Sequence, residues 1–432
     1  MTESKAVNHR KLAITSRILL FAFLLTLIVS TARQGIASYY FRQNSPDALQ
    51  KAMVWYPPNP LYPAALANLV HLYGRNADPD EVFRLYQTAA RLSPFDAAFT
   101  ADLAQANDWA GRTDFALPLF QRAQQLFPNS PDINWKLANF YIRSGKTDES
   151  LPALKKILSS NIIEKNQIFA LSDRAGINSV TVVDKLLSPD IPSYFAYLNF
   201  EIQRGNFSDA QQTWNRLLSL NLPFDPRETF PYLDALIKSH ELDSASQVWA
   251  SLVSRFPDRI PSSASANNLI TNGNLQADIL NGAFDWRIFP VSGVAVTPDS
   301  TGPSADARSL RVEFDGTQNL YYGSVLQFVR AQPHTRYKFS AFTRSQALTT
   351  DAGVGLQISD AYDTNKILAS TEPLIGTTPW SEQSFSFETP PETRLLIVRI
   401  VRLPSQKLDN KIAGAFWLSR VSLTLPPAPR SP

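Results

Sequence analysis

The 432-residue chain contains no cysteine, which excludes disulfides, thiolate metal sites, a cysteine nucleophile and lipid attachment to cysteine. Charged residues are also scarce, at 18% of the chain, and 41 basic residues nearly balance 38 acidic ones. A balanced charge excludes the strongly basic surface on which nucleic-acid binding depends. The composition therefore predicts a folded chain with no nucleic-acid partner.

Catalytic signatures are lacking as well. The four histidines are widely separated, and none belongs to the zinc-binding His-Glu-x-x-His pattern. The sequence has no Gly-x-Ser-x-Gly elbow, no Gly-x4-Gly-Lys phosphate loop and no Gly-x-Gly-x-x-Gly turn. We therefore predict no catalytic residues, no metal site and no cofactor, and we expect that the chain is not an enzyme. An unrecognised glycan-active enzyme stays open as an alternative.

An uncharged apolar segment lies near the N-terminus, at residues 18–32, and the basic residues before it outnumber the acidic ones. This charge asymmetry predicts a cytoplasmic N-terminus, with the remaining chain exported. Counted from Leu12, the segment has twenty-one residues and spans about 31 Å, enough for a ~30 Å hydrocarbon core.

We therefore predict membrane contact through residues 12–33 of a single-pass protein in the cytoplasmic (inner) membrane of a bacterium. The bulk of the chain is then periplasmic or extracytoplasmic, and Tyr39, Tyr40 and Phe41 would form an interfacial belt. A cleaved signal peptide is the alternative, because residues 30–32 are small.

A repeat follows, because Pro60, Pro94 and Pro128 are spaced 34 residues apart. Units at 63–96, 97–130 and 131–164 place similar residues at the same offsets, and Gly111 and Gly145 fall where one helix must turn into the next. The pattern predicts stacked pairs of antiparallel helices.

This period and its small residues resemble the tetratricopeptide repeat. Further copies are predicted at 191–224 and 226–259, together with a degenerate first unit that ends at Pro60 and whose first helix overlaps the membrane segment. Residues 165–190 do not match the repeat, although 179–187 are expected to form one helix.

The resemblance implies protein partners that bind a concave face, lined by the second, fifth, ninth and twelfth positions of each first helix. The alternative for the aromatic positions is packing between neighbouring units. The predicted partner-binding residues are Gln105, Asp108, Trp135, Asn139, Phe195, Asn199, Phe230 and Asp234.

The last third of the chain alternates polar and apolar residues in short runs, such as 309–314, 336–344 and 394–402. Period two and about 8 to 10 strands predict an all-β sandwich of two sheets over 268–425. Small polar residues at 261–267 indicate a linker, and we expect 426–432 to be a disordered tail.

The runs NLITNGNLQ, RYKFSAFTR and FWLSRVSL, with Trp286 and Trp380, resemble the jelly rolls of carbohydrate-binding modules and galactose-binding-like domains. The resemblance implies glycan binding on aromatic platforms, for which Tyr321, Tyr322 and Tyr362 are the candidates, while Trp286 and Trp380 are expected in the core. Such modules often hold a structural calcium. Gln276 and Ser419 stand at the ligand positions without a charge, so no metal is expected.

The fold class is thus a multidomain chain with one N-terminal transmembrane helix, an all-α tetratricopeptide-type solenoid and an all-β jelly-roll sandwich. Its domains are expected at 1–41, 42–260 and 268–425. We expect a non-catalytic, membrane-anchored envelope scaffold whose solenoid binds proteins and whose sandwich binds glycan or protein. By analogy with such repeats, exopolysaccharide or O-antigen assembly is its predicted setting. A purely structural scaffold with a spacer sandwich is the alternative.

Overall fold

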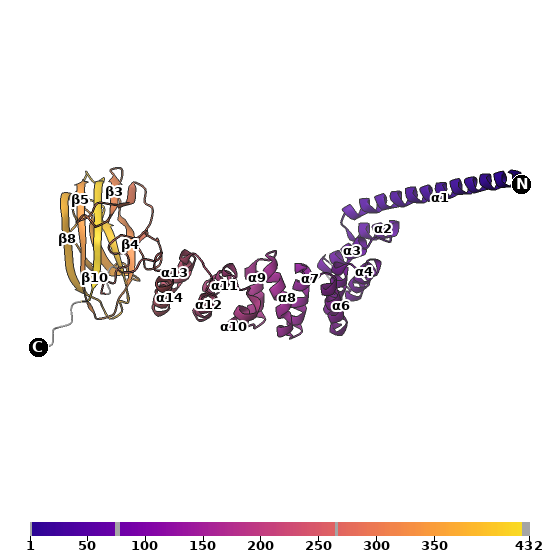
Figure 1. Ribbon diagram of the computed structural model, residues 1–432, viewed down its shortest axis with the longest axis horizontal. Helices are drawn as coiled ribbons and strands as arrows, with labels where there is room; N and C mark the ends of the chain where they lie inside the picture. Colours follow the sequence, from indigo (N-terminus) through magenta and orange to yellow (C-terminus); the bar gives the residue numbers. More distant parts are fainter. Residues whose placement is uncertain (1, 74–77, 264–266, 426–432) are drawn as a thin grey trace. The chain divides into compact units, whose positions relative to one another are not determined.

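The computed structural model describes the backbone of residues 2–73, 78–263 and 267–425 (Figure 1). The expected tail at 426–432 and the middle of the expected linker, residues 264–266, lie outside the described residues. Contacts divide the chain into two compact units, Met1–Phe200 and Glu201–Pro432, which are described separately. The division falls inside the helical region, so the last helices belong to the same unit as the strands.

The first unit consists of helices that follow one another as antiparallel pairs (Figure 1). They are α1 (Thr2–Arg42), α2 (Pro46–Trp55), α3 (Leu61–Tyr73), α4 (Pro79–Leu92), α5 (Ala97–Trp109), α6 (Thr113–Leu126), α7 (Pro131–Arg143), α8 (Thr147–Ser160), α9 (Lys165–Arg174), α10 (Ser179–Thr181), η1 (Val182–Leu186) and α11 (Ile191–Gln203), whose last residues enter the second unit.

Local sequence explains where the paired helices begin and end. Asp96 caps α5 by accepting the N–H of Ala98 at 2.8 Å, and Ser130 caps α7 in the same manner. Gly111 and Gly145 end α5 and α7 with φ of 72° and 70°, a conformation that costs glycine little. The predicted glycine turns between paired helices are therefore confirmed.

Small and aromatic residues fill the space between the pairs. Ala104 and Ala116 are fully buried and let α5 and α6 approach closely, while Phe120 packs against Phe140 of the next pair. This interdigitation explains why the repeat keeps alanine and an aromatic residue at fixed offsets.

α1 is continuous from the apolar segment into the first helical pair, as the overlap with a degenerate first unit predicts. Its residues Thr15–Arg42 are long and apolar enough to cross a membrane, by length and composition. Its C-terminal end packs on α2 and α3, because Ala37 forms a buried cluster with Ala52 and Tyr62. Tyr40 and Phe41 pack against the same cluster and are half-buried, whereas Tyr39 is exposed, so the interfacial belt stays a prediction.

Residues 165–190 form a short helical pair, whose second member covers the helix expected at 179–187. α9 is followed by the single turn of α10, capped by Asn178, and then by the π-helix η1 over Val182–Leu186. The expected helix over 179–187 is therefore confirmed as far as Leu186, and the i to i+5 pattern of η1 replaces the α-helical one after its first turn.

The second unit begins with further helices and ends with a sandwich (Figure 1). The helices are α12 (Phe207–Ser219), η2 (Pro226–Thr229), α13 (Phe230–Lys238) and α14 (Leu242–Arg255). The strands are β1 (Arg287–Ile288), β2 (Val294–Asp299), β3 (Ser309–Asp315), β4 (Tyr322–Arg330), β5 (Arg336–Leu348), β6 (Gly355–Asp360), β7 (Ile367–Ser370), β8 (Gly376–Glu388), β9 (Leu395–Arg402) and β10 (Ala413–Thr424).

The strands form two antiparallel five-stranded sheets, as expected for a sandwich. Sheet one has the order β1-β4-β9-β6-β7, and sheet two the order β2-β3-β10-β5-β8. One apolar core lies between them and includes Trp286, Phe339 and Phe416, which are fully buried. The expected core position of Trp286 is confirmed, whereas Trp380 is only half-buried on the edge strand β8.

The outer face of sheet one is covered by the last helical pair, α13 and α14. Residues that point away from the sandwich core on this face are nevertheless buried, as is Ile397 of β9. Its cross-strand partner, Phe328 of β4, lies beneath the guanidinium of Arg287. Arg287 in turn forms an ion pair with Asp234 of α13 at 2.5 Å. Phe284 packs edge-on against Trp249 of α14, so helices and sandwich share an apolar contact.

Candidate binding surfaces

Ion pairs connect successive first helices of the solenoid at intervals of one repeat. Lys136 of α7 contacts Asp102 of α5 at 2.7 Å, and Arg143 forms an ion pair with Asp108. Burial raises the pKa of Asp102, although the lysine opposes the change. Burial lowers the pKa of Lys136, but Asp102 and Asp132 hold it above its ordinary value. These contacts fix the neighbouring repeats relative to each other.

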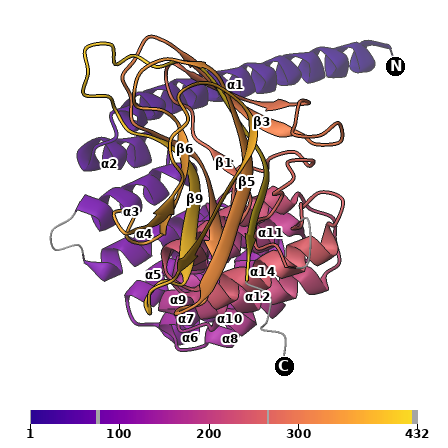
Figure 2. The ribbon, with the colours of Figure 1, turned by 90° about the vertical axis from the view of Figure 1, so that its left-hand side faces the viewer.

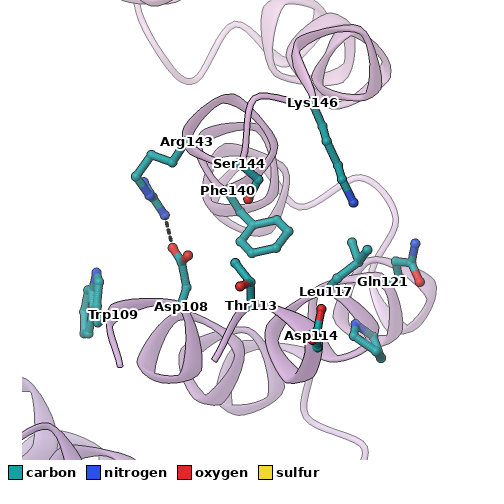
Figure 3. A pocket seen from close by; sticks show the side chains of 11 residues that line it. Asp108, Trp109, Thr113, Asp114, Leu117, Gln121, Phe140, Arg143, Ser144 and Lys146 are labelled. Carbon is teal, nitrogen blue, oxygen red and sulfur yellow. Dashed lines mark hydrogen bonds and ion pairs between the residues drawn. The ribbon is translucent and has the colours of Figure 1, made fainter. Parts of the chain in front are cut away.

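A groove of about 650 Å³ lies between two consecutive repeats of the first unit (Figure 3). It is formed by the end of α5 with the start of α6, and by the end of α7 with the start of α8. Figure 3 shows Phe140 at its centre, Asp108 and Arg143 on one side, and Gln121 and Lys146 on the other. The groove therefore combines an apolar floor with a charged rim.

The structure brings only part of the predicted concave-face set together. Asp108 lines the groove, where it pairs with Arg143. Gln105, Trp135 and Asn139 are half-buried on α5 and α7, and the Asn139 amide donates to the carbonyl of Trp135 at 2.9 Å. Because this bond occupies an amide N–H within its own helix, Asn139 is less suited to reading a peptide backbone than the sequence suggests.

Three further predicted positions are not open binding positions. Phe195 and Phe230 are buried, so the alternative that these aromatics serve packing holds for both. Asp234 binds Arg287 from the sandwich. The prediction of partner binding by Phe230 and Asp234 is therefore wrong, because the sandwich occupies their side of α13. Asn199 is exposed on α11.

Sequence reasoning missed the other charged residues of the groove, Asp114, Arg143 and Lys146. Lys146 follows Gly145 in the turn, and Arg143 is the last residue of α7. Trp109, at the end of α5, was missed too, and its ring stacks on His71 of α3 at 3.6 Å. These residues could have been predicted from the sequence, because they lie at helix ends one repeat apart and the stacking of repeats brings equivalent turns side by side.

The three predicted glycan-binding tyrosines lie in different surroundings in the sandwich. Tyr321 is exposed, with 50% of its surface accessible, whereas Tyr322 is fully buried against Phe314. Tyr362 stacks on His240 at 3.6 Å, and its hydroxyl donates to the carbonyl of Ile237 at 2.6 Å. The prediction of a platform is wrong for Tyr322, and Tyr362 belongs to the contact with α13 and α14.

The two positions compared with calcium ligands act as hydrogen-bond donors. The amide of Gln276 donates to the carbonyl of Asp306 at 2.9 Å, and the hydroxyl of Ser419 donates to that of Arg308 at 2.5 Å. Both side chains thus donate to backbone carbonyls of the loop between β2 and β3. Over the described residues, no group of three or more histidine, aspartate or glutamate side chains is placed to hold a metal ion.

The outer face of sheet two carries a cluster around Trp417 of β10. Its register neighbours are Arg311 of β3 and Arg344 of β5, whose guanidinium carbons lie 5.5 and 4.7 Å from the indole. The indole N–H donates to Asp299 at 2.8 Å. Burial raises the pKa of Asp299, but hydrogen bonds from Trp417 and Thr301 outweigh it and leave the pKa below its ordinary value.

Residues 110–161 match the family model described as tetratricopeptide repeat. A search of curated proteins gives no match. Among solved structures, MamA protein is 18% identical, and the match covers 46% of this chain and 98% of that one with a TM-score of 0.28. A family 16 carbohydrate-binding module is 20% identical, with 36% and 99% coverage and a TM-score of 0.25.

The enzymatically active domain of bacteriophage CBA120 tailspike protein 4 is 15% identical over 37% of this chain, with a TM-score of 0.28. The match spans only 21% of that chain. The protein described here therefore has helical pairs that match the tetratricopeptide repeat at residues 110–161, followed by a two-sheet antiparallel sandwich.

Proposed function

We propose that this protein is a non-catalytic, membrane-anchored scaffold whose solenoid binds a protein partner in the groove of Figure 3. The observation that carries the proposal is the groove itself, with Phe140 and Leu117 at its apolar centre and Lys146 and Arg143 at its rim. An apolar pocket edged by a few polar groups suits an extended peptide segment that inserts one apolar side chain.

Site-specific photo-crosslinking in the native host tests this binding. A photoreactive residue at Gln121, which lines the groove, should form a discrete adduct with a protein. Gln125, one turn further along α6 and exposed, is the matched control and should form none. The substitution Lys146→Glu reverses a rim charge and should abolish the Gln121 adduct. Equal adducts at both positions, or an adduct unaffected by Lys146→Glu, would refute the groove as the binding site.

The proposed membrane position is supported by the sequence and length of α1. Basic residues precede the apolar run, so the N-terminus stays in the cytoplasm and the remainder is periplasmic or extracytoplasmic, at the inner membrane of a bacterium. We propose an uncleaved anchor, supported by the continuity of α1 from Thr15 into the cluster around Ala37. A phosphatase fused after Pro432 should be active only outside the cytoplasm. An N-terminal tag should remain on the mature protein, and its loss would indicate a cleaved signal peptide.

Glycan binding by the sandwich is a second candidate function, favoured by the cluster around Trp417. The outer face of sheet one is covered by α13 and α14, which leaves the outer face of sheet two for a ligand. Arg311 and Arg344 present two guanidinium groups there, with Arg311 in an ion pair with Glu313 at 3.0 Å, and guanidinium groups bind carboxylates in a bidentate manner. The ligand class is therefore an acidic polysaccharide, in keeping with a role in exopolysaccharide or O-antigen assembly.

Affinity electrophoresis of the full chain in detergent tests this function, with alginate as the acidic and galactan as the neutral polysaccharide. We expect retardation by alginate alone, lost when Arg311 and Arg344 are both replaced by alanine. Arg336→Ala is the control, since Arg336 lies on the same strand as Arg344 about 26 Å away. If neither polysaccharide retards the chain, the sandwich is a spacer.

The absence of catalysis is likewise part of the proposal. Incubating the full chain with the same polysaccharides should release no reducing ends. Turnover that disappears on replacement of a single carboxylate would replace the scaffold by an enzyme.

A further inference from the structure

The turn between α2 and α3 has an unusual composition for a surface exposed to water. Residues 54–61, here called the α2–α3 corner, read VWYPPNPL and carry no charge. The uncharged stretch around them extends from Ala52 to Val70. Such a stretch needs an apolar neighbour to cover its exposed side chains.

The α2–α3 corner lies beside the membrane segment of α1. α2 packs antiparallel on α1, so that Ala52 meets Ala37 and the backbone carbonyl of Trp55 accepts the Nε–H of Arg33 at 3.0 Å. Figure 1 and Figure 2 both show α2 alongside the C-terminal part of α1. The chain therefore runs back toward the membrane as it approaches Pro57.

The corner lies beside the C-terminal turns of the apolar run of α1. A pocket of about 360 Å³ is lined by residues of α1 and of the corner together, namely Thr26, Val29, Ser30, Arg33, Trp55, Tyr56, Pro57 and Pro58. Thr26 lies seven residues before Arg33, which is about 10 Å along the helix. If Arg33 marks the end of the spanning stretch, the corner overlaps the outermost ~10 Å of that stretch.

The N–H groups of the corner need no hydrogen bond from water. Pro57, Pro58 and Pro60 have no N–H group to satisfy. The N–H of Tyr56 donates to the carbonyl of Ala52 at 3.0 Å, that of Asn59 to Tyr56 at 3.4 Å, and that of Leu61 to the side chain of Asn59 at 3.0 Å. Every N–H from 56 to 61 is thus absent or internally bonded, a requirement of apolar surroundings.

The side chains of the corner point outward despite being apolar. Val54, Trp55 and Leu61 have 73%, 39% and 52% of their surfaces exposed. Tryptophan is favoured at the boundary between headgroups and acyl chains, and an arginine at that level meets the lipid phosphates. The corner supplies both, through Trp55 and the adjacent Arg33.

We propose that the α2–α3 corner is a second membrane contact, which inserts Val54, Trp55 and Leu61 into the outer headgroup boundary of a phospholipid bilayer beside α1. The proposal rests on the proposed uncleaved anchor and deepens it. A bilayer is favoured over a protein partner because the corner is continuous with the membrane segment through the shared pocket. The first repeat is then held against the membrane at two points.

Depth measurements on single-cysteine variants of the full chain test the proposal, and the absence of native cysteine makes them clean. Leu61→Cys and Val54→Cys report on the corner. Leu72→Cys is the matched control, because Leu72 lies at the opposite end of α3 and is 69% exposed. Val29→Cys reports on the anchor. Each variant carries an environment-sensitive fluorophore in phosphatidylcholine and phosphatidylglycerol vesicles, with nitroxide lipid and aqueous iodide as quenchers.

Labels at Leu61 and Val54 should be quenched by nitroxide lipid and should show several-fold weaker iodide quenching than the label at Leu72. Lipid quenching at Val29 with iodide quenching at Val54 and Leu61 equal to that at Leu72 would overturn the corner and leave the anchor intact. Absence of lipid quenching at Val29 would overturn the anchor, and the corner with it.

Discussion

Asp285 is fully buried in the loop before β1, and its replacement by asparagine should remove a pH dependence from the stability of the second unit. Its carboxylate accepts the N–H of Leu280 at 2.7 Å. Burial raises the pKa of Asp285 to about 6, although backbone N–H groups of Leu280 and Trp286 oppose the change. The native state therefore binds a proton between about pH 4 and pH 6 that the unfolded state has already released.

The sign and size follow from this difference in proton binding. Since the folded-state pKa is raised, the free energy of unfolding falls as the pH rises from about 4 to about 6. The gap between 3.8 and about 6 amounts to about 3 kcal/mol, at about 1.36 kcal/mol per pKa unit. Above pH 7 the wild-type protein has lost this whole contribution, whereas asparagine stays neutral throughout.

Hydrogen exchange of peptides from β4 and β9, in the full chain in detergent, measures the free energy of opening between pH 4.5 and 8. The wild-type value should fall by about 2 kcal/mol more than that of Asp285→Asn across this range, because the rest of the change lies below pH 4.5. Other carboxylates contribute equally to both proteins, so their effect on the pH profile cancels in the comparison. One of them is Asp315: hydrogen bonds from Thr317 lower its pKa, so its contribution to stability changes in the opposite direction, at lower pH. Parallel pH profiles would refute the reasoning.

Three further substitutions probe the packing. Gly282→Ala would place a Cβ 2.5 Å from the ring of Phe230, so it should destabilise the contact between α13 and the sandwich by about 1 to 3 kcal/mol. The loss is measured as faster hydrogen exchange in α13. Adding Phe230→Leu to the same chain should restore part of the loss, and purely additive effects of the two substitutions would contradict the clash. Arg402→Leu should lower the melting temperature of the second unit, at a cost of about 3 to 5 kcal/mol in the free energy of unfolding. The reason is that the buried guanidinium donates to the carbonyls of Ala352, Leu320 and Asn410. An unchanged melting temperature would show that these carbonyls find other donors. Lys136→Met should cost more in urea unfolding than Asp102→Asn, since it leaves the mostly buried carboxylate of Asp102 without its lysine; equal costs would contradict this asymmetry.

Much of the fold is local in origin, and the sequence predicts that part. The prolines 34 residues apart and the turns at Gly111 and Gly145 reflect packing between neighbouring helices, so the pattern repeats wherever the packing does. Alternation likewise predicts strands such as β3 and β5, because each has one face on the core. The domain bounds expected at 42–260 and 268–425 stay a prediction.

The candidate surfaces were less predictable. Adjacent tyrosines 321 and 322 had to point to opposite sides, yet only the pairing of β4 with β9 decides that Tyr322 faces the core. Asp108 was found because its helical position is fixed by the repeat, whereas Lys146 enters the groove through the stacking of two turns.

The sequence by itself determined the apolar N-terminal helix, the helical repeat and the presence of a sandwich, because these depend on contacts between residues close along the chain. Tertiary structure alone decided which faces remain open. Tyr362 meets Ile237 across 125 residues, and Arg330 reaches Ser246 across 84, so that α13 and α14 cover sheet one. No periodicity encodes such contacts, since they require two distant segments to meet and exclude water from their common surface.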